Sequence, residues 1–161
     1  MFREMRRKKQ QLPQEVCTEI LNSATSGVLA LSGDDDYPYA LPISYVYHDQ
    51  TIYIHCATEG HKLDAVRRNP KASFCVIAQD DVVPERHTTR YRSVIAFGRI
   101  EVLESGAEKQ HALELTARKY SPMLDLSKHI VQDGPHCLIF ALRIEHLTGK
   151  ESRELMQERN A

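Results

Sequence analysis

Residues 51–70 read Thr-Ile-Tyr-Ile-His-Cys-Ala-Thr-Glu-Gly-His-Lys-Leu-Asp-Ala-Val-Arg-Arg-Asn-Pro. The first part, Thr51 to Cys56, alternates as a half-buried strand does and is rich in β-branched and aromatic residues. From about Gly60 onward the apolar residues follow helical spacing, and this helix must stop before Pro70. The stretch therefore predicts a strand that leads through a short turn into a helix.

The turn between this strand and this helix carries Gly60, with His55, His61 and Lys62 clustered around it. The start of a helix leaves backbone N–H groups unpaired, at the end where the macrodipole is positive. These N–H groups and the added lysine suit a phosphate. We interpret the turn as the phosphate end of a cofactor site.

Composition limits the class of protein. The chain has 161 residues, of which 42% are apolar and 27% charged, which is typical of one globular domain. A net charge of −1 argues against a general nucleic-acid-binding protein, which is usually strongly basic. No apolar run approaches the roughly 20 residues that cross a bilayer, and the basic N-terminus lacks the apolar core of a signal peptide. We expect no nucleic-acid or membrane partner.

The four cysteines lie far apart, at Cys17, Cys56, Cys75 and Cys137, and form no CxxC pair. This spacing disfavours a zinc site and gives no disulfide framework. We therefore expect no metal site, and a reduced, cytoplasmic protein.

The apolar patterns predict a mainly β, α+β chain whose six strands are too consecutive for a parallel sheet. The predicted strands cover Thr25–Ser32, Tyr37–His48, Thr51–Cys56, Lys71–Gln79, Tyr91–Glu104 and Cys137–His146. Two to four helices surround them, over Pro13–Ala24, from Gly60 to before Pro70, over Glu108–Tyr120 and after a turn at Thr148–Lys150. Asp80–Arg90 reads as a loop, and Met123–Pro135 as a short helix with a loop. An antiparallel barrel is the economical way to remove the strand edges.

Three details refine this prediction. Pro38 and Pro42 remove ladder hydrogen bonds from the second strand, which indicates a sheet edge, a bulge or a kink. Gly98 indicates a bulge in the fifth strand. The acidic run Asp34–Asp36 lacks the glutamate of a calcium loop, so we interpret it as a solvated hairpin tip.

Four stretches then appear in an order and at a spacing that are familiar. They are Tyr-Pro-Tyr-Ala-Leu-Pro-Ile-Ser-Tyr (37–45), Ile-Tyr-Ile-His-Cys-Ala-Thr-Glu-Gly-His-Lys (52–62), Asn69-Pro70 with Ser73-Phe74, and Tyr-Arg-Ser-Val-Ile-Ala-Phe-Gly (91–98). The opening Met-Phe-Arg-Glu-Met-Arg-Arg-Lys and the closing Thr-Gly-Lys-Glu (148–151) fit the same pattern. The chain resembles the pyridoxamine-phosphate-oxidase-like flavoproteins with a split β-barrel, and among them the Nim-type 5-nitroimidazole-resistance proteins.

The resemblance implies one FMN-binding domain over 1–161 with 1–12 as a basic arm, a six-stranded split barrel, and a homodimer with FMN bound between the subunits. Lys62 would then meet the FMN phosphate, and the kinked strand would lie along the isoalloxazine ring. The cofactor-binding residues implied in this way are Leu41, Pro42, Ile43, Ser44, His55, Cys56, Ala57, Gly60, Lys62 and Ser93.

The implied activity is an NAD(P)H-dependent reduction of small electrophiles such as 5-nitroimidazoles, from nitro group to amine. His55 or His61 would supply protons, because imidazole titrates near neutral pH. His55 on its strand is equally well read as a buried core histidine. The alternative function is a non-catalytic flavin-binding protein, or a haem-binding protein that uses such a histidine. Pyridoxamine phosphate oxidation itself is disfavoured because the chain lacks an arginine-rich C-terminus.

Overall fold

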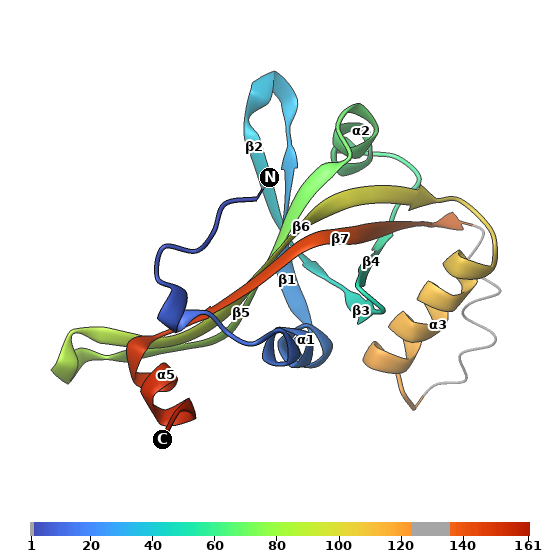
Figure 1. Cartoon of the computed structure of the whole chain (residues 1–161). Helices are drawn as coiled ribbons and strands as arrows, with labels where there is room; N and C mark the ends of the chain where they lie inside the picture. The colour runs from blue at the N-terminus through green and yellow to red at the C-terminus, as the bar shows by residue number, and fades with distance from the viewer. Residues whose placement is uncertain (1, 124–135) are drawn as a thin grey trace.

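The computed structural model describes residues 2–123 and 136–161. Within them, seven strands form one antiparallel sheet in the order β2-β1-β5-β6-β7-β4-β3, with helices around it (Figure 1). The strands are β1 Ser26–Ser32, β2 Pro38–Ser44, β3 Val46–His48, β4 Thr51–Cys56, β5 Lys71–Val83, β6 Thr88–Leu103 and β7 Leu138–Glu151. The helices are α1 Gln14–Ser23, α2 His61–Arg68, α3 Ala107–Tyr120 and α5 Arg153–Arg159, with 3-10 turns at Lys8–Gln10, Asp34–Asp36 and Pro84–Arg86. The predicted mainly β class is confirmed.

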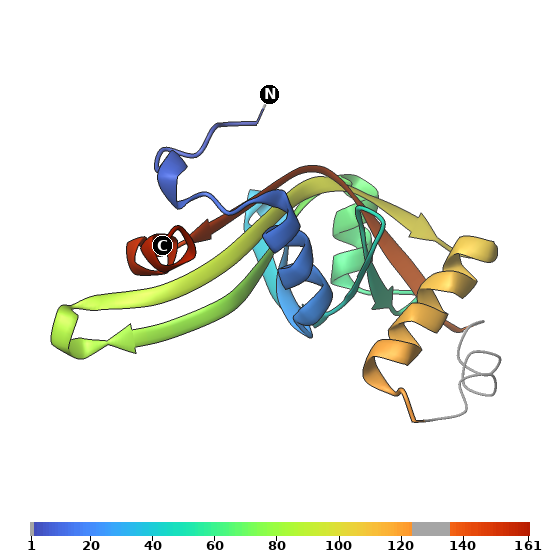
Figure 2. The same ribbon diagram turned by 60° about the horizontal axis from the view of Figure 1, so that its bottom comes forward.

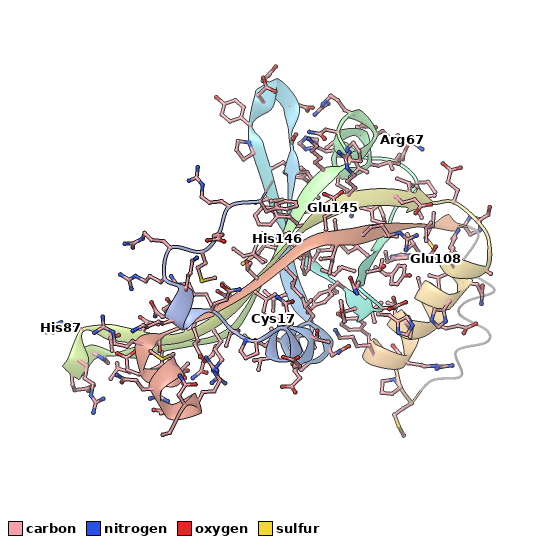
Figure 3. The ribbon with its side chains drawn as sticks, in the orientation of Figure 1. Cys17, Arg67, His87, Glu108, Glu145 and His146 are labelled. Carbon is pink, nitrogen blue, oxygen red and sulfur yellow. The ribbon has the colours of Figure 1, made fainter. Side chains whose placement is uncertain are left out.

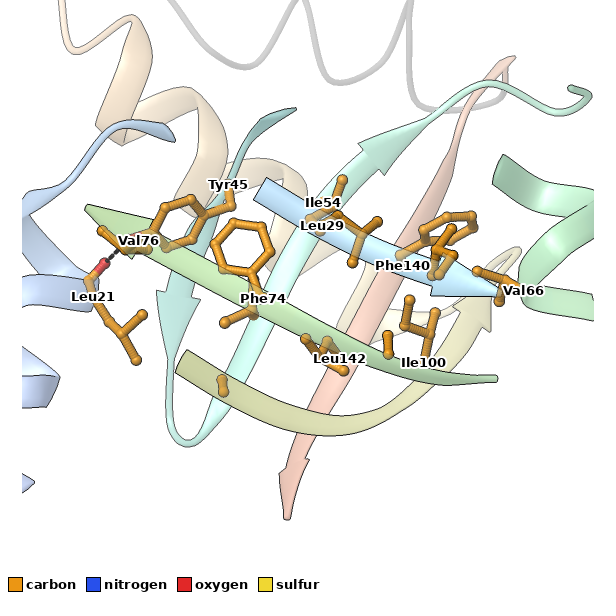
Figure 4. Close-up of a cluster of buried hydrophobic side chains, with 14 of the residues drawn as sticks. Leu21, Leu29, Tyr45, Ile54, Val66, Phe74, Val76, Ile100, Phe140 and Leu142 are labelled. Carbon is orange, nitrogen blue, oxygen red and sulfur yellow. Dashed lines mark hydrogen bonds between the residues drawn. The ribbon is translucent and has the colours of Figure 1, made fainter. Parts of the chain in front are cut away.

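The sheet coils around an apolar core to which alternate residues of each strand contribute. Fully buried side chains such as Leu29, Ile54, Phe74 and Phe140 meet inside it (Figure 4). Helices α1 and α2 pack against this core, whereas α3 covers a second, smaller cluster over β3, β4 and β7. Among the described helices, none is long and apolar enough to span a membrane.

The predicted count of six strands is wrong, because the predicted strand Tyr37–His48 is two strands. β2 pairs with β1, and β3 pairs with β4, so the chain moves between the two ends of the sheet order within one residue, Tyr45. A run of β-forming residues does not reveal which partner each part of it pairs with. The prolines of β2 lie on a strand at the end of the order, as the prediction of an edge required.

The predicted loop Asp80–Arg90 is also wrong. β5 and β6 stay paired to Val83 and Thr88, and the turn around His87 caps a two-stranded arm. This arm reaches beyond the barrel and past α5 (Figure 2). Because both of its faces are away from the core, its sequence is polar and lacks the alternation that identifies a half-buried strand.

Near the C-terminus, the predicted turn Thr148–Lys150 is wrong because β7 continues through it to Glu151. Gly149 is buried there, in contact with α1 and the segment before it, so this glycine permits a close approach rather than a turn. The predicted bulge at Gly98 is confirmed by a register shift between Phe97 and Gly98. Of the predicted segment Met123–Pro135, residues 124–135 lie outside the described residues.

Candidate functional site

The turn before α2 has the geometry of an anion seat. Gly60 has a φ of 121°, a conformation that favours glycine, and a Cβ there would meet nothing within 4 Å. Its carbonyl accepts hydrogen bonds from the N–H groups of Leu63 and Asp64, at 3.0 and 3.1 Å. The helix's own bonding therefore begins at these two residues, and the N–H groups of His61 and Lys62 precede it. Lys62 is the second residue of α2 and therefore lies at the positive end of the helix dipole.

Lys62 lies near the C-terminal end of β4. Burial raises the pKa of the Cys56 thiol, and the positive charge of Lys62 partly opposes this shift, so the two groups are close. Cys56 points into the core, whereas His55 is exposed on the opposite face of the strand. The interpretation of His55 as a buried core histidine is therefore wrong. Ala57 follows, exposed, at the start of the turn.

The β1–β2 hairpin is attached to the start of α2. The His61 ring stacks on the Tyr39 ring, with centroids 4.1 Å apart and planes 12° apart. Asp34 Oδ2 lies 3.5 Å from His61 Nε2, and Asp34 Oδ1 lies 3.1 Å from Arg68 Nη1. These contacts bring the proline-containing strand β2 beside the turn that carries Lys62, as Figure 1 also shows for the hairpin and α2.

Along β2, burial alternates from one residue to the next. Leu41 and Ile43 are half-buried and pack against the core, so their side chains are used for folding. Pro42 and Ser44 are exposed on the other face. Any molecule lying along this strand would therefore meet Pro42, Ser44 and backbone groups of the sheet edge. The acidic tip of the hairpin is exposed as expected, but sequence reasoning missed that Asp34 and Tyr39 anchor α2.

Ser93 is far from this site within one chain. It lies on β6, opposite Ile77 of β5 and Lys150 of β7. Lys71, which follows α2, pairs with Arg99 of β6. Ser93 lies six residues from Arg99 along β6, which places it about 20 Å from the end of α2. The structure thus brings together the candidate residues of β2, β4 and α2, but not Ser93.

The sheet carries exposed apolar side chains on the face where Ser93 lies. We call these four residues the outer stripe; they are Ile77, Val82, Ile95 and Phe97, with exposed fractions of 66%, 69%, 38% and 38%. Phe2 of the N-terminal arm lies against this face, stacked on His146 at 4.7 Å and 5.5 Å from Phe97. An exposed apolar patch of this kind marks an interaction surface.

A groove of about 540 Å³ lies between α1, β3 and β7, lined among others by Tyr47, Glu145 and His146. Glu145 and His146 are labelled on β7 in Figure 3. The residues that line this groove include none of the predicted site residues.

Two arginines of the central strands pair with acids of their own chain. Arg92 contacts Glu151, and Arg143 binds Glu108 through both Nη atoms, at 2.6 and 2.8 Å. Hydrogen bonds from Arg143, and then from Tyr53, lower the pKa of Glu108 to about 2. This cluster attaches the start of α3 to the sheet, so its pKa shift reflects docking of the helix.

The described residues define a class: a split-barrel protein whose edge strand lies beside the lysine-bearing turn before α2. The family model described as pyridoxamine 5'-phosphate oxidase matches residues 13–151, and the chain belongs to this family. The superfamily identified from the sequence motifs is thereby confirmed.

Similar solved structures include the following three. A candidate 5-nitroimidazole antibiotic resistance protein from Bacteroides thetaiotaomicron VPI-5482 has a TM-score of 0.75 and 22% identity, covering 88% of this chain and 86% of that one. A FAD-binding protein from Mesorhizobium loti has a TM-score of 0.64 and 27% identity, covering 88% and 96%. The FAD and heme binding protein from Mycobacterium smegmatis has a TM-score of 0.74 and 22% identity, covering 94% and 80%. These likenesses show a common split-barrel fold.

Proposed function

We propose that this protein binds FMN at the turn before α2 and along β2, and that it is an NAD(P)H-dependent reductase of small electrophilic compounds such as 5-nitroimidazoles. One observation carries the proposal: the stack of His61 on Tyr39, which holds the lysine-bearing turn beside the proline-containing strand. The FAD-binding protein from Mesorhizobium loti, in the same fold, supports a flavin as the ligand.

The residues present fit such a cofactor. A phosphate needs a cation and N–H donors, and the turn offers Lys62 with the N–H groups of His61 and Lys62. A flat ring needs an open surface with a few polar groups, which Pro42, Ser44 and the backbone of β2 provide. Bound flavin would supply the hydride chemistry, while the protein binds and orients it.

Proton supply would fall to His55 or His61. Both imidazoles are exposed, and His61 directly precedes Lys62 with its ring held by Tyr39.

A homodimer completes the proposal. A flavin shared between two chains would meet Lys62 of one chain and Ser93 of the other, which would explain the separation of about 20 Å along the sheet. The exposed outer stripe and the two-stranded arm of β5 and β6 support a dimer in which a second copy of the chain covers both. An isolated two-stranded hairpin is at best marginally stable in water, so the arm needs such a partner. In this proposal residues 1–161 form one domain with 1–12 as an arm, which Phe2 and Gln10 attach to the sheet.

The cofactor assignment is tested by Lys62→Ala. Loss of a charge-assisted phosphate contact costs about 1.5–3 kcal/mol, so the variant should release FMN on dialysis while the wild type retains it. Lys9→Ala, which removes an exposed lysine of the N-terminal arm, is the matched control and should retain FMN. Stoichiometric FMN in dialysed Lys62→Ala would remove the phosphate assignment.

The dimer is tested by gel filtration, where the protein should elute near twice 18.4 kDa. Ile95→Asp places a charge on the outer stripe and should give a monomer that binds FMN weakly. Met123→Asp changes an apolar residue that is 93% exposed, outside that stripe, and should leave both properties unchanged. A wild-type monomer with tightly bound FMN would contradict a shared site.

The reaction is tested on protein loaded with FMN under anaerobic conditions. Flavin absorbance should bleach on addition of NAD(P)H and recover on addition of a 5-nitroimidazole, with the amine detected by mass spectrometry. The likeness to the FAD and heme binding protein from Mycobacterium smegmatis supports a second candidate, a non-catalytic flavin- or haem-binding protein. A Soret band after addition of haem, with no bleaching by NAD(P)H, would favour that second function.

A further inference from the structure

The corner between β2 and β3 consists of a single residue, Tyr45. Pairing of β2 with β1 ends at Ser44, and pairing of β3 with β4 begins at Val46. The Tyr45 side chain is 1% exposed, and its hydroxyl donates a hydrogen bond of 2.8 Å to the Leu21 carbonyl (Figure 4). The core therefore fixes this side chain, but the Tyr45 N–H and C=O lie between two ladders and need other partners.

Tyr120, the last residue of α3, provides those partners. Its hydroxyl accepts a hydrogen bond from the Tyr45 N–H at 3.0 Å. The same oxygen lies 2.7 Å from the Tyr45 carbonyl and 2.5 Å from the Thr25 carbonyl. A phenol carries one hydrogen, so it donates to one of these two carbonyls at a time. The Tyr120 hydroxyl thus provides a hydrogen-bond partner for the backbone of Tyr45 and connects it to Thr25, the residue before β1.

The neighbouring Lys119 strengthens this attachment. Its Nζ donates a hydrogen bond of 2.5 Å to the Ala24 carbonyl and lies 4.4 Å from the centroid of the Tyr45 ring. Burial lowers the pKa of Lys119, because removal from water disfavours the charged ammonium form. The C-terminal end of α3 is therefore anchored to the corner by two adjacent residues.

We propose that Tyr120 is a positioning residue for the flavin site, acting through the backbone of Tyr45. The proposal rests on the function proposed above. β2 lies at the end of the sheet order, so its C-terminal end is held by β1 and by this corner. Freeing the corner would let the backbone of 41–44 shift, and a loss of preorganisation of this kind weakens binding without removing any direct contact.

The test compares two substitutions at opposite ends of α3. Tyr120→Phe removes only the hydroxyl and should weaken FMN binding about tenfold, measured by quenching of flavin fluorescence. Glu108→Gln loosens the other end of the helix, where Glu108 binds Arg143 and Tyr53, and should leave FMN affinity within about twofold. Both titrations are made where circular dichroism shows fully folded protein.

Amide exchange gives a readout that is independent of flavin. The Tyr45 amide should be protected in the flavin-free wild type and should exchange at least about tenfold faster in Tyr120→Phe. An unprotected Tyr45 amide in the wild type, unchanged FMN affinity in Tyr120→Phe, or an equal loss in both variants would overturn the positioning role. Failure of the wild type to bind any flavin would instead overturn the proposed function, and amide exchange would still decide whether Tyr120 holds the corner.

Discussion

Replacing Glu151 by alanine should cost about 2–3 kcal/mol of the free energy of unfolding. This carboxylate at the end of β7 is 0% exposed and accepts hydrogen bonds from Arg159 Nε at 2.7 Å and Arg92 Nε at 3.2 Å. Its backbone carbonyl also accepts a bond from Gln10 at 2.9 Å. One side chain therefore connects the centre of the sheet with α5.

The magnitude follows from what each partner loses. A hydrogen bond to a charged group contributes about 1.5–3 kcal/mol, and the longer bond to Arg92 belongs at the low end. Because the side chains of Arg92 and Arg159 are 32% and 27% exposed, both regain water in the variant, which keeps the cost below that of a fully buried orphan charge.

Urea unfolding followed by circular dichroism measures this loss. With m near 2 kcal/mol/M, the midpoint should fall by about 1–1.5 M, at one fixed protein concentration because association shifts the midpoint. Glu151→Gln keeps the shape and should lie between the wild type and Glu151→Ala.

Glu145→Ala is the control on the same strand. Glu145 pairs with Arg99 at 3.2 Å, but both side chains are about half exposed, so the cost should be below about 0.5 kcal/mol. A loss for Glu151→Ala of less than about 1 kcal/mol, or one equal to that of Glu145→Ala, would refute this reasoning.

Three further predictions concern the sheet and α3. Arg143 and then Tyr53 lower the pKa of Glu108 from 4.5 to about 2, so the stabilisation is complete above pH 4.5 and is lost as the pH falls toward 2. Glu108→Gln should remove about 1 kcal/mol at pH 6 and much less at pH 2, measured by urea unfolding at both pH values; an equal loss at both would contradict it. Gly98→Ala should cost more than about 2 kcal/mol in the same assay because its Cβ would collide with the Arg143 carbonyl, whereas Gly106→Ala, with open space and φ of 97°, should cost about 1 kcal/mol; similar losses would contradict the collision. Tyr45→Phe should cost about 1–3 kcal/mol of unfolding free energy by leaving the buried Leu21 carbonyl unpaired, and an unchanged urea midpoint would contradict this hydrogen bond.

Local patterns predicted the strand, turn and helix that carry the candidate site, because these parts lie close together in the sequence. The strand, turn and helix from Thr51 to Arg68 follow from alternation, Gly60 and the stop before Pro70. Gly98 likewise identified its bulge, because a missing side chain in a strand usually marks one. The proposal of an anion seat at Lys62 depends on these same local rules.

The features that sequence reasoning missed depend on pairing between distant segments. Tyr45, where the two strands separate, and Tyr120, whose hydroxyl accepts a hydrogen bond from the Tyr45 N–H, lie 75 residues apart. Neither residue type signals such a contact. From the sequence alone Asp34 is interpreted as part of a solvated hairpin tip, because its ion pair with Arg68 of α2 depends on the fold. The extension of β7 through Gly149 is set by the segment from Leu12 to Cys17 packing against it, which a local turn rule cannot anticipate.

The sheet order has a consequence for how the chain acquires its structure during synthesis. β3 and β4 connect to the rest of the sheet through β7, which leaves the ribosome after the other six described strands. Until Leu138 and the residues after it emerge, the hairpin of β3 and β4 has no neighbour on its inner edge, and the apolar side chains of β4 stay uncovered. The nascent protein should therefore close its barrel only after β7 has emerged, and a chain that terminates before β7 should be a substrate for chaperones and proteases.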